Sequence, residues 1–205
     1  GFYTIDSSIV LTAAPIEKRA PYANVVKYYG YIDPAVKSDG MYKGKKAYYL
    51  YFWVPAAIDE VGIAMYSPSD GTPGSGDFKG PKFHENFNKD NKSFFDTYVA
   101  LERIPVMDST KIKKAKGAAG MVLGQNDDTG EIPANPGGQH YNSVLRVLTN
   151  VRNPTKALVR SVYRITFTSF RGNIKGSFVA QVGTNIPGVK IASSLDELDK
   201  LVNTK

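Results

Sequence analysis

The chain has 205 residues, of which 42% are hydrophobic and 12% aromatic, and it contains no cysteine. These values are ordinary for one globular domain, and they exclude disulfides, thiolate metal sites and a cysteine nucleophile. The formal net charge of +7 favours anionic partners in general, and no apolar run reaches the roughly 18 residues of a membrane-spanning helix. We therefore expect a single domain over residues 1–205.

Runs of β-branched and aromatic residues recur along the chain, and each predicts a strand. These runs occupy residues 7–14, 24–32, 45–54, 94–104, 143–151, 158–170 and 175–183. In the sixth run Tyr163, Ile165 and Phe167 alternate with polar residues, which is typical of an antiparallel strand with one face on a core. Segments 67–80 and 131–139 are rich in proline and glycine and are predicted to be surface loops.

Long helices do not alternate with these strands, so an antiparallel β-sandwich with peripheral helices is the simplest packing. One helix is expected at residues 193–202, where leucines recur at helical spacing and Ser194 and Glu197 have the spacing of a capping box. This amphipathic C-terminal helix is expected to cover an open side of the sandwich.

A second helix is expected after Asp108 or Ser109, either of which can cap it. Its lysines are Lys111, Lys113, Lys114 and Lys116. A solvated helix face is the simpler interpretation, and a surface for a polyanion or a membrane is the alternative. No aromatic stacking platform accompanies the lysines, so we expect no specific recognition of nucleic acid.

The sequence offers little support for catalysis, and we expect that the chain is not an enzyme. It has no nucleophile elbow, no phosphate-binding loop and no dinucleotide fingerprint. Asp127 and Asp128 are adjacent in a loop, whereas a glycosidase needs two carboxylates roughly 5 to 10 Å apart, one of them with a raised pKa.

The segment 124–131, GQNDDTGE, does offer the mixture of carboxylate and carbonyl oxygens that calcium prefers. It lacks the spacing of an EF-hand, so a plain turn is the simpler interpretation of this segment taken alone. Asp96 is a third acid, and it lies within a predicted strand, where aspartate is uncommon. A carboxylate in that place indicates either a solvent-exposed strand face or a cationic partner.

Several long collinear stretches then resemble one family. They include VVKYYGYIDP, GKKAYYLYFWVPAAIDEVGIAMYSP, FFDTYVALER, YNSVLRV and LVRSVYRITFTSFRGNIKGSFVAQVG. These stretches, between Val25 and Val189, are similar to the major outer-membrane surface lipoprotein family of Leptospira, the haemolysis-associated lipoproteins. The first twenty-odd residues and the tail beyond Ile191 match poorly.

The resemblance implies a jelly-roll β-sandwich, a bacterial outer-membrane location through a lipid anchor upstream of Gly1, no catalytic activity, and a calcium site. Carried over by position, the calcium ligands are Asp96, Thr97, Asp127, Asp128 and Tyr141, with Thr97 and Tyr141 expected to contribute backbone carbonyls. The family's loop has a longer run of aspartates than this one, which implies weaker or less salt-sensitive binding here.

The resemblance also implies a structural or adhesive role, with extracellular-matrix proteins as partners, although no short motif in this sequence carries adhesion. The alternative is a lectin-like module, because the 13 tyrosines could stack on sugars. Packing within strands is the simpler role for those tyrosines.

Overall fold

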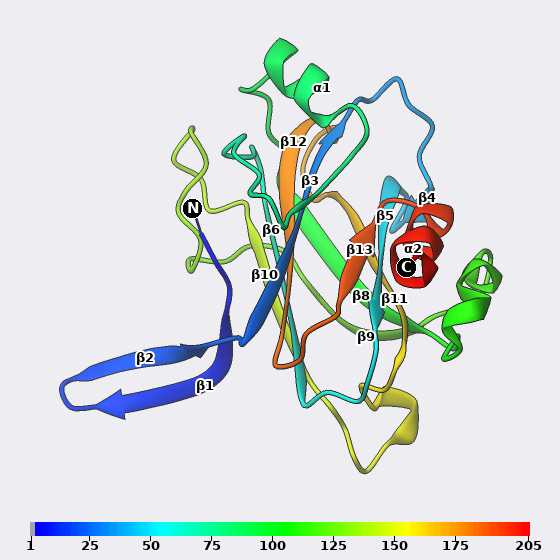
Figure 1. Cartoon of the computed structure of the whole chain (residues 1–205). Coiled ribbons are helices and arrows are strands. Elements are labelled where there is room, and N and C mark those ends of the chain that lie inside the picture. The colour runs from blue at the N-terminus through cyan, green and yellow to red at the C-terminus, as the bar shows by residue number, and fades with distance from the viewer. Residues whose placement is uncertain (1–2) are drawn as a thin grey trace.

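The computed structural model describes residues 3–205, with 42% of the chain in strands and 13% in helices (Figure 1). The strands are β1 (Asp6–Ala13), β2 (Ile16–Pro21), β3 (Asn24–Ile32), β4 (Gly40–Tyr42), β5 (Lys45–Val54), β6 (Glu60–Tyr66), β7 (Phe78–Lys79), β8 (Thr97–Ile104), β9 (Met121–Asn126), β10 (Ser143–Leu148), β11 (Ser161–Ser169), β12 (Gly176–Thr184) and β13 (Lys190–Ala192). The helices are α1 (Phe83–Lys89), α2 (Leu195–Asn203) and the 3₁₀ helices η1 (Ser109–Ala115) and η2 (Pro154–Lys156).

Two sheets face each other in the order β10-β6-β12-β3-β7 and β13-β5-β11-β8-β9, and β4 also pairs with β5. Apart from the parallel pair of β3 and β7, the ladders of these sheets are antiparallel. Removing the short strands leaves four in each sheet, β10-β6-β12-β3 and β5-β11-β8-β9. This is the eight-strand order of a jelly roll, in which the chain crosses repeatedly between the sheets. The prediction of a mainly β sandwich is confirmed.

The main hydrophobic core lies between the two sheets and takes side chains from both. In β11, Tyr163, Ile165 and Phe167 are buried in this core, as the alternation predicted. The opposite face of β11 is less open than predicted, because Thr166 is buried as well and donates to Glu102.

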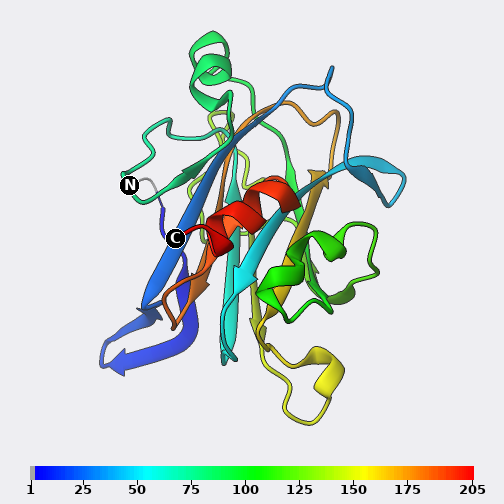
Figure 2. The ribbon, with the colours of Figure 1, turned by 45° about the vertical axis from the view of Figure 1, so that its right-hand side comes forward.

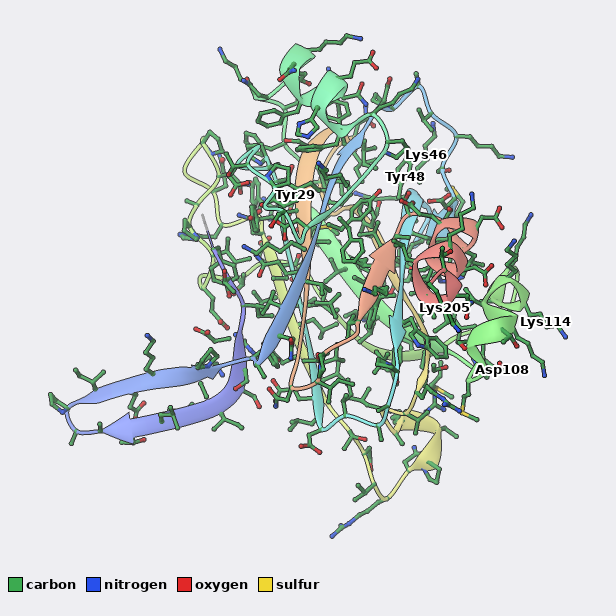
Figure 3. The ribbon with its side chains drawn as sticks, viewed as in Figure 1. Tyr29, Lys46, Tyr48, Asp108, Lys114 and Lys205 are labelled. Carbon is green, nitrogen blue, oxygen red and sulfur yellow. The ribbon has the colours of Figure 1, made fainter. Side chains whose placement is uncertain are left out.

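Further clusters cover both outer faces of the sandwich. On the first sheet, α1 places Phe83 against Tyr29, and Figure 3 shows Tyr29 among the interior side chains. Figure 2 shows the C-terminal helix α2, in red, lying across the second sheet. This helix buries Leu198 in a cluster with Trp53. The hydroxyl of Ser194 accepts a hydrogen bond from the Glu197 amide, so the predicted cap and the covering role of the C-terminal helix are confirmed.

A two-stranded ribbon, β1 with β2, projects sideways from the sandwich (Figure 1). Its outer part exposes aliphatic side chains, including Leu11 and Ile16. Its base is fixed by the carboxylate of Glu60, which accepts hydrogen bonds from Ser8 and Tyr22.

The seven predicted strands exist, with shifted ends: β8 begins at Thr97 and β10 ends at Leu148. The helix after Asp108 is a 3₁₀ helix, and Asp108 caps it by accepting from the Thr110 amide. Figure 3 shows Lys114 pointing outward from it. The predicted loop 67–80 contains the short strand β7, while segment 131–139 has neither helix nor strand.

Candidate metal centre

The predicted ligands come from three separate segments that meet at one end of the sandwich. Asp96 immediately precedes β8, Asp127 and Asp128 follow β9, and Tyr141 lies two residues before β10. Because β8 and β9 are antiparallel neighbours, the start of β8 and the end of β9 lie side by side. Asp96 therefore stands just outside the strand in which the sequence placed it.

Asp96 is the most deeply buried of the three aspartates, with 3% of its side chain exposed. Both of its carboxylate oxygens are buried and without a hydrogen-bond partner among the described residues. Its backbone is held in place, because its carbonyl accepts from the Phe170 amide at 2.7 Å. A buried carboxylate with both oxygens unsatisfied is costly unless it is protonated or meets a cation.

Burial raises the pKa of Asp96 to about 6, and repulsion from Asp128 and Asp127 contributes to the increase. The guanidinium of Arg171 acts in the opposite direction. The two loop carboxylates are thus close enough to repel Asp96, which is the relation expected of ligands that share one cation.

Thr97 and Tyr141 are joined directly by backbone. The Thr97 amide donates to the Tyr141 carbonyl at 2.8 Å, and the Thr97 hydroxyl lies 3.1 Å from the same oxygen. The Ser143 hydroxyl donates to the Thr97 carbonyl at 2.8 Å. Both carbonyls predicted as ligands are therefore already hydrogen-bonded, although a carbonyl oxygen has a second lone pair.

The loop that carries Asp127 and Asp128 is tied to β10 through Asn126, whose amide nitrogen donates to the Val144 carbonyl. The Asn126 side-chain oxygen accepts from the Asp127 amide at 2.9 Å. Asp127 is half-buried and Asp128 is exposed. An open depression of about 430 Å³ lies beside Asp128 and Tyr141.

Two residues at this end were not singled out from the sequence. Arg171 places its Nε 3.7 Å from Asp96 Oδ2, and its guanidinium lies over the ring of Tyr141, 5.5 Å from the centroid. Gln139 lines the depression, and its buried side-chain oxygen has no partner among the described residues. Neither carries a local sequence signal, since both are brought here by strand pairing and loop folding.

Within residues 3–205, no three acidic, histidine or cysteine side chains are close enough together to hold a metal ion by themselves. A calcium shell here would need carbonyl or amide oxygens, or water, beside the carboxylates. The arrangement places three carboxylates near one guanidinium, and among the described residues the most buried carboxylate, that of Asp96, has an ion pair with Arg171 but no hydrogen bond.

A family model for surface lipoproteins of the Spirochaetales order, named Lipl32, matches residues 16–191. The chain belongs to this family. The match covers the β-sandwich, from β2 to β13, and agrees with the resemblance drawn from the sequence. Membership in this surface lipoprotein family supports a location on the cell surface, outside the cytoplasm.

No curated protein matches the chain. In the part of the chain that the structure describes, no helix is long and apolar enough to cross a membrane.

Proposed function

We propose that this member of the surface lipoprotein family is a non-catalytic protein that binds calcium at the candidate metal centre, with Asp96, Asp127 and Asp128 as the charged ligands. The observation that carries the proposal is the buried carboxylate of Asp96, neither oxygen of which has a hydrogen-bond partner among residues 3–205. A bound calcium ion would supply two positive charges beside this carboxylate.

Further oxygens are available close to the three carboxylates. The Thr97 carbonyl, which accepts from the Ser143 hydroxyl, keeps a lone pair, and the Gln139 oxygen, which has no partner among the described residues, lines the adjoining depression. The Tyr141 carbonyl would have to give up its contact with the Thr97 hydroxyl to bind the ion. Calcium accepts six to eight oxygens in flexible geometry, whereas magnesium requires a small octahedral shell and releases water reluctantly. The exposed position of Asp128 on a loop therefore favours calcium over magnesium.

Isothermal titration of chelator-treated protein with calcium tests the proposal. Wild-type protein should bind one calcium ion and show much weaker heat with magnesium. Asp128→Asn keeps the size of the side chain and removes its charge, so it should weaken binding at least about tenfold; Asp96→Asn should do the same.

The matched control is Asp59→Asn, which removes one exposed carboxylate elsewhere on the surface. Affinity in this variant should stay within about twofold of wild type. Calcium binding that survives Asp96→Asn and Asp128→Asn unchanged would remove these residues from the site.

We further propose that the protein is attached to the outer membrane by a lipid on a segment upstream of Gly1. The printed chain has no cysteine, so the lipid would be carried by a cysteine of the upstream segment. The precursor should incorporate labelled palmitate, and replacement of that upstream cysteine should abolish the incorporation. Adhesion to extracellular-matrix proteins stays a prediction of the family resemblance.

A further inference from the structure

A basic and apolar loop lies at the opposite end of the sandwich from the candidate metal centre. It joins β10 to β11 and contains η2; we call residues 148–160 the basic tip. Figures 1 and 2 show this loop, in yellow, projecting below the sandwich. β10 starts beside the metal centre and ends at the tip, so its six residues separate the two by about 20 Å.

The tip exposes two large aliphatic side chains. Val151 is 85% exposed and Leu148 is 62% exposed. Met121 and Val122, at the start of β9, are 40% and 46% exposed, and β9 contacts η2. Single exposed aliphatic residues are common, whereas a group of them at one edge of a domain indicates an interaction surface.

The charges of the tip all have the same sign. Arg152, Lys156 and Arg160 are exposed, and none of them forms an ion pair within residues 3–205. The chain has no aspartate or glutamate between Glu131 and Asp196. The tip therefore presents cations that no neighbour in its own segment neutralises.

The loop is held by its own hydrogen bonds. The Asn150 side-chain oxygen accepts from the amides of Arg152 and Asn153, and the Asn153 side-chain oxygen accepts from the Thr155 amide. Arg103 on β8 donates to the Ala157 carbonyl. These bonds satisfy the backbone while Val151 remains exposed, so the apolar side chain is displayed by an ordered turn.

We propose that the basic tip docks on a lipid bilayer that contains anionic lipid. Phosphate-bearing head groups complement the three unpaired cations, and the head-group region accepts Val151 and Leu148, which a water-soluble polyanion has no means of burying. The contact needs no calcium at the metal centre, because the two lie at opposite ends of β10. Three cations and two aliphatic side chains give a reversible membrane contact, which suits a protein that is also held at the membrane by a second attachment.

Vesicle sedimentation of the whole chain tests the proposal, using equal parts phosphatidylglycerol and phosphatidylcholine against phosphatidylcholine alone. The first variant replaces Arg152, Lys156 and Arg160 with glutamine, and the second is Val151→Ser. The matched control replaces Lys79, Lys82 and Lys92 with glutamine, which removes the same charge from exposed positions around α1. None of these three lysines forms an ion pair with another described residue.

Wild-type protein should bind the anionic vesicles only, equally in calcium and in chelator. Each tip cation should contribute about fivefold to the binding constant, so the triple tip variant should bind about 100-fold more weakly. Val151→Ser should weaken binding severalfold, whereas the control variant should stay within about threefold of wild type and Asp128→Asn should bind normally.

Equal losses in the tip and control variants would overturn the proposal in favour of a general charge effect. Binding that depends on the cations but not on Val151, with heparin competing for the same residues, would overturn it in favour of a soluble polyanion. Absence of vesicle binding by the wild type would also overturn it.

Discussion

Replacing Asp96 with asparagine should stabilise the calcium-free protein, and it should do so only above acid pH. The pKa of Asp96 is raised from 3.8 to about 6, so the folded protein holds this proton more tightly than the unfolded chain. The stability that the proton provides is complete below pH 3.8 and is lost as the pH rises through about 6. At about 1.36 kcal/mol per pKa unit, wild-type protein loses at most about 3 kcal/mol from this carboxyl over that window.

The variant has no such carboxyl, so its advantage over wild type should grow by up to about 3 kcal/mol between about pH 4 and pH 7.5. The buried amide has its own desolvation cost, but that cost is the same at every pH. The assay is urea unfolding in chelator, followed by the fluorescence of Trp53, the single tryptophan, which is buried.

Calcium should offset most of this difference at neutral pH. At a calcium concentration of about 100 times the dissociation constant, wild-type protein gains about 2.7 kcal/mol, and the variant should gain little of it. A stability difference between the two proteins that is constant with pH, in chelator, would refute the view that burial raises the pKa of the Asp96 carboxyl.

Three other predictions concern single features. Arg171→Gln should raise calcium affinity by up to about tenfold, because a guanidinium about 6 Å from the ion repels it by about 1.4 kcal/mol in water. Arg171→Lys keeps the charge and should bind calcium as wild type does. Equal calcium affinities for the two variants would contradict this prediction. Leu198→Ala should lower the free energy of unfolding, measured in urea, by about 2 to 5 kcal/mol, because Leu198 is buried. Leu201 is only half-buried, so Leu201→Ala should lower it clearly less. Equal losses in the two variants would contradict the packing of α2. Amide hydrogen exchange should be faster in the outer β1–β2 ribbon than in β11 or β12, because an isolated two-stranded ribbon is only marginally stable. Protection of the ribbon amides equal to that of the β12 amides would indicate that the ribbon is covered in solution.

The strands that the sequence predicted share one property, a dense run of β-branched or aromatic residues. β6 was missed because it includes Gly62 and Ala64, which have low strand preference. Its burial on both faces also removes the alternation that marks a half-buried strand. The glycine is needed, since a Cβ at residue 62 would lie 2.4 Å from the Tyr22 hydroxyl oxygen. That requirement comes from tertiary packing and is invisible in the local sequence.

Helix α1 was missed for a different reason. It has only seven residues, and Lys82 at its N-terminal boundary gives no side-chain cap. By contrast, α2 is a longer helix whose leucines recur at helical spacing, and Ser194 caps it. The sequence was therefore sufficient to predict this helix.

For the candidate metal centre, the sequence singled out Asp96 because aspartate is uncommon within a predicted strand. It did not identify Arg171, whose position depends on the register that pairs Ser169 with Thr97 across β11 and β8. Nor did it show that the Tyr141 carbonyl accepts from the Thr97 amide. Which strands pair, and in what register, is a property of the whole sandwich.

We propose above that one calcium ion binds between Asp96 and the Asp127–Asp128 loop. The most direct test is anomalous diffraction from crystals grown with calcium, with a chelator-treated crystal as the control. We expect one strong anomalous peak in contact with carboxylate oxygens of Asp96 and of Asp127 or Asp128, which disappears in the control. A calcium peak elsewhere in the molecule, or no peak at concentrations that saturate the titration, would contradict the claim.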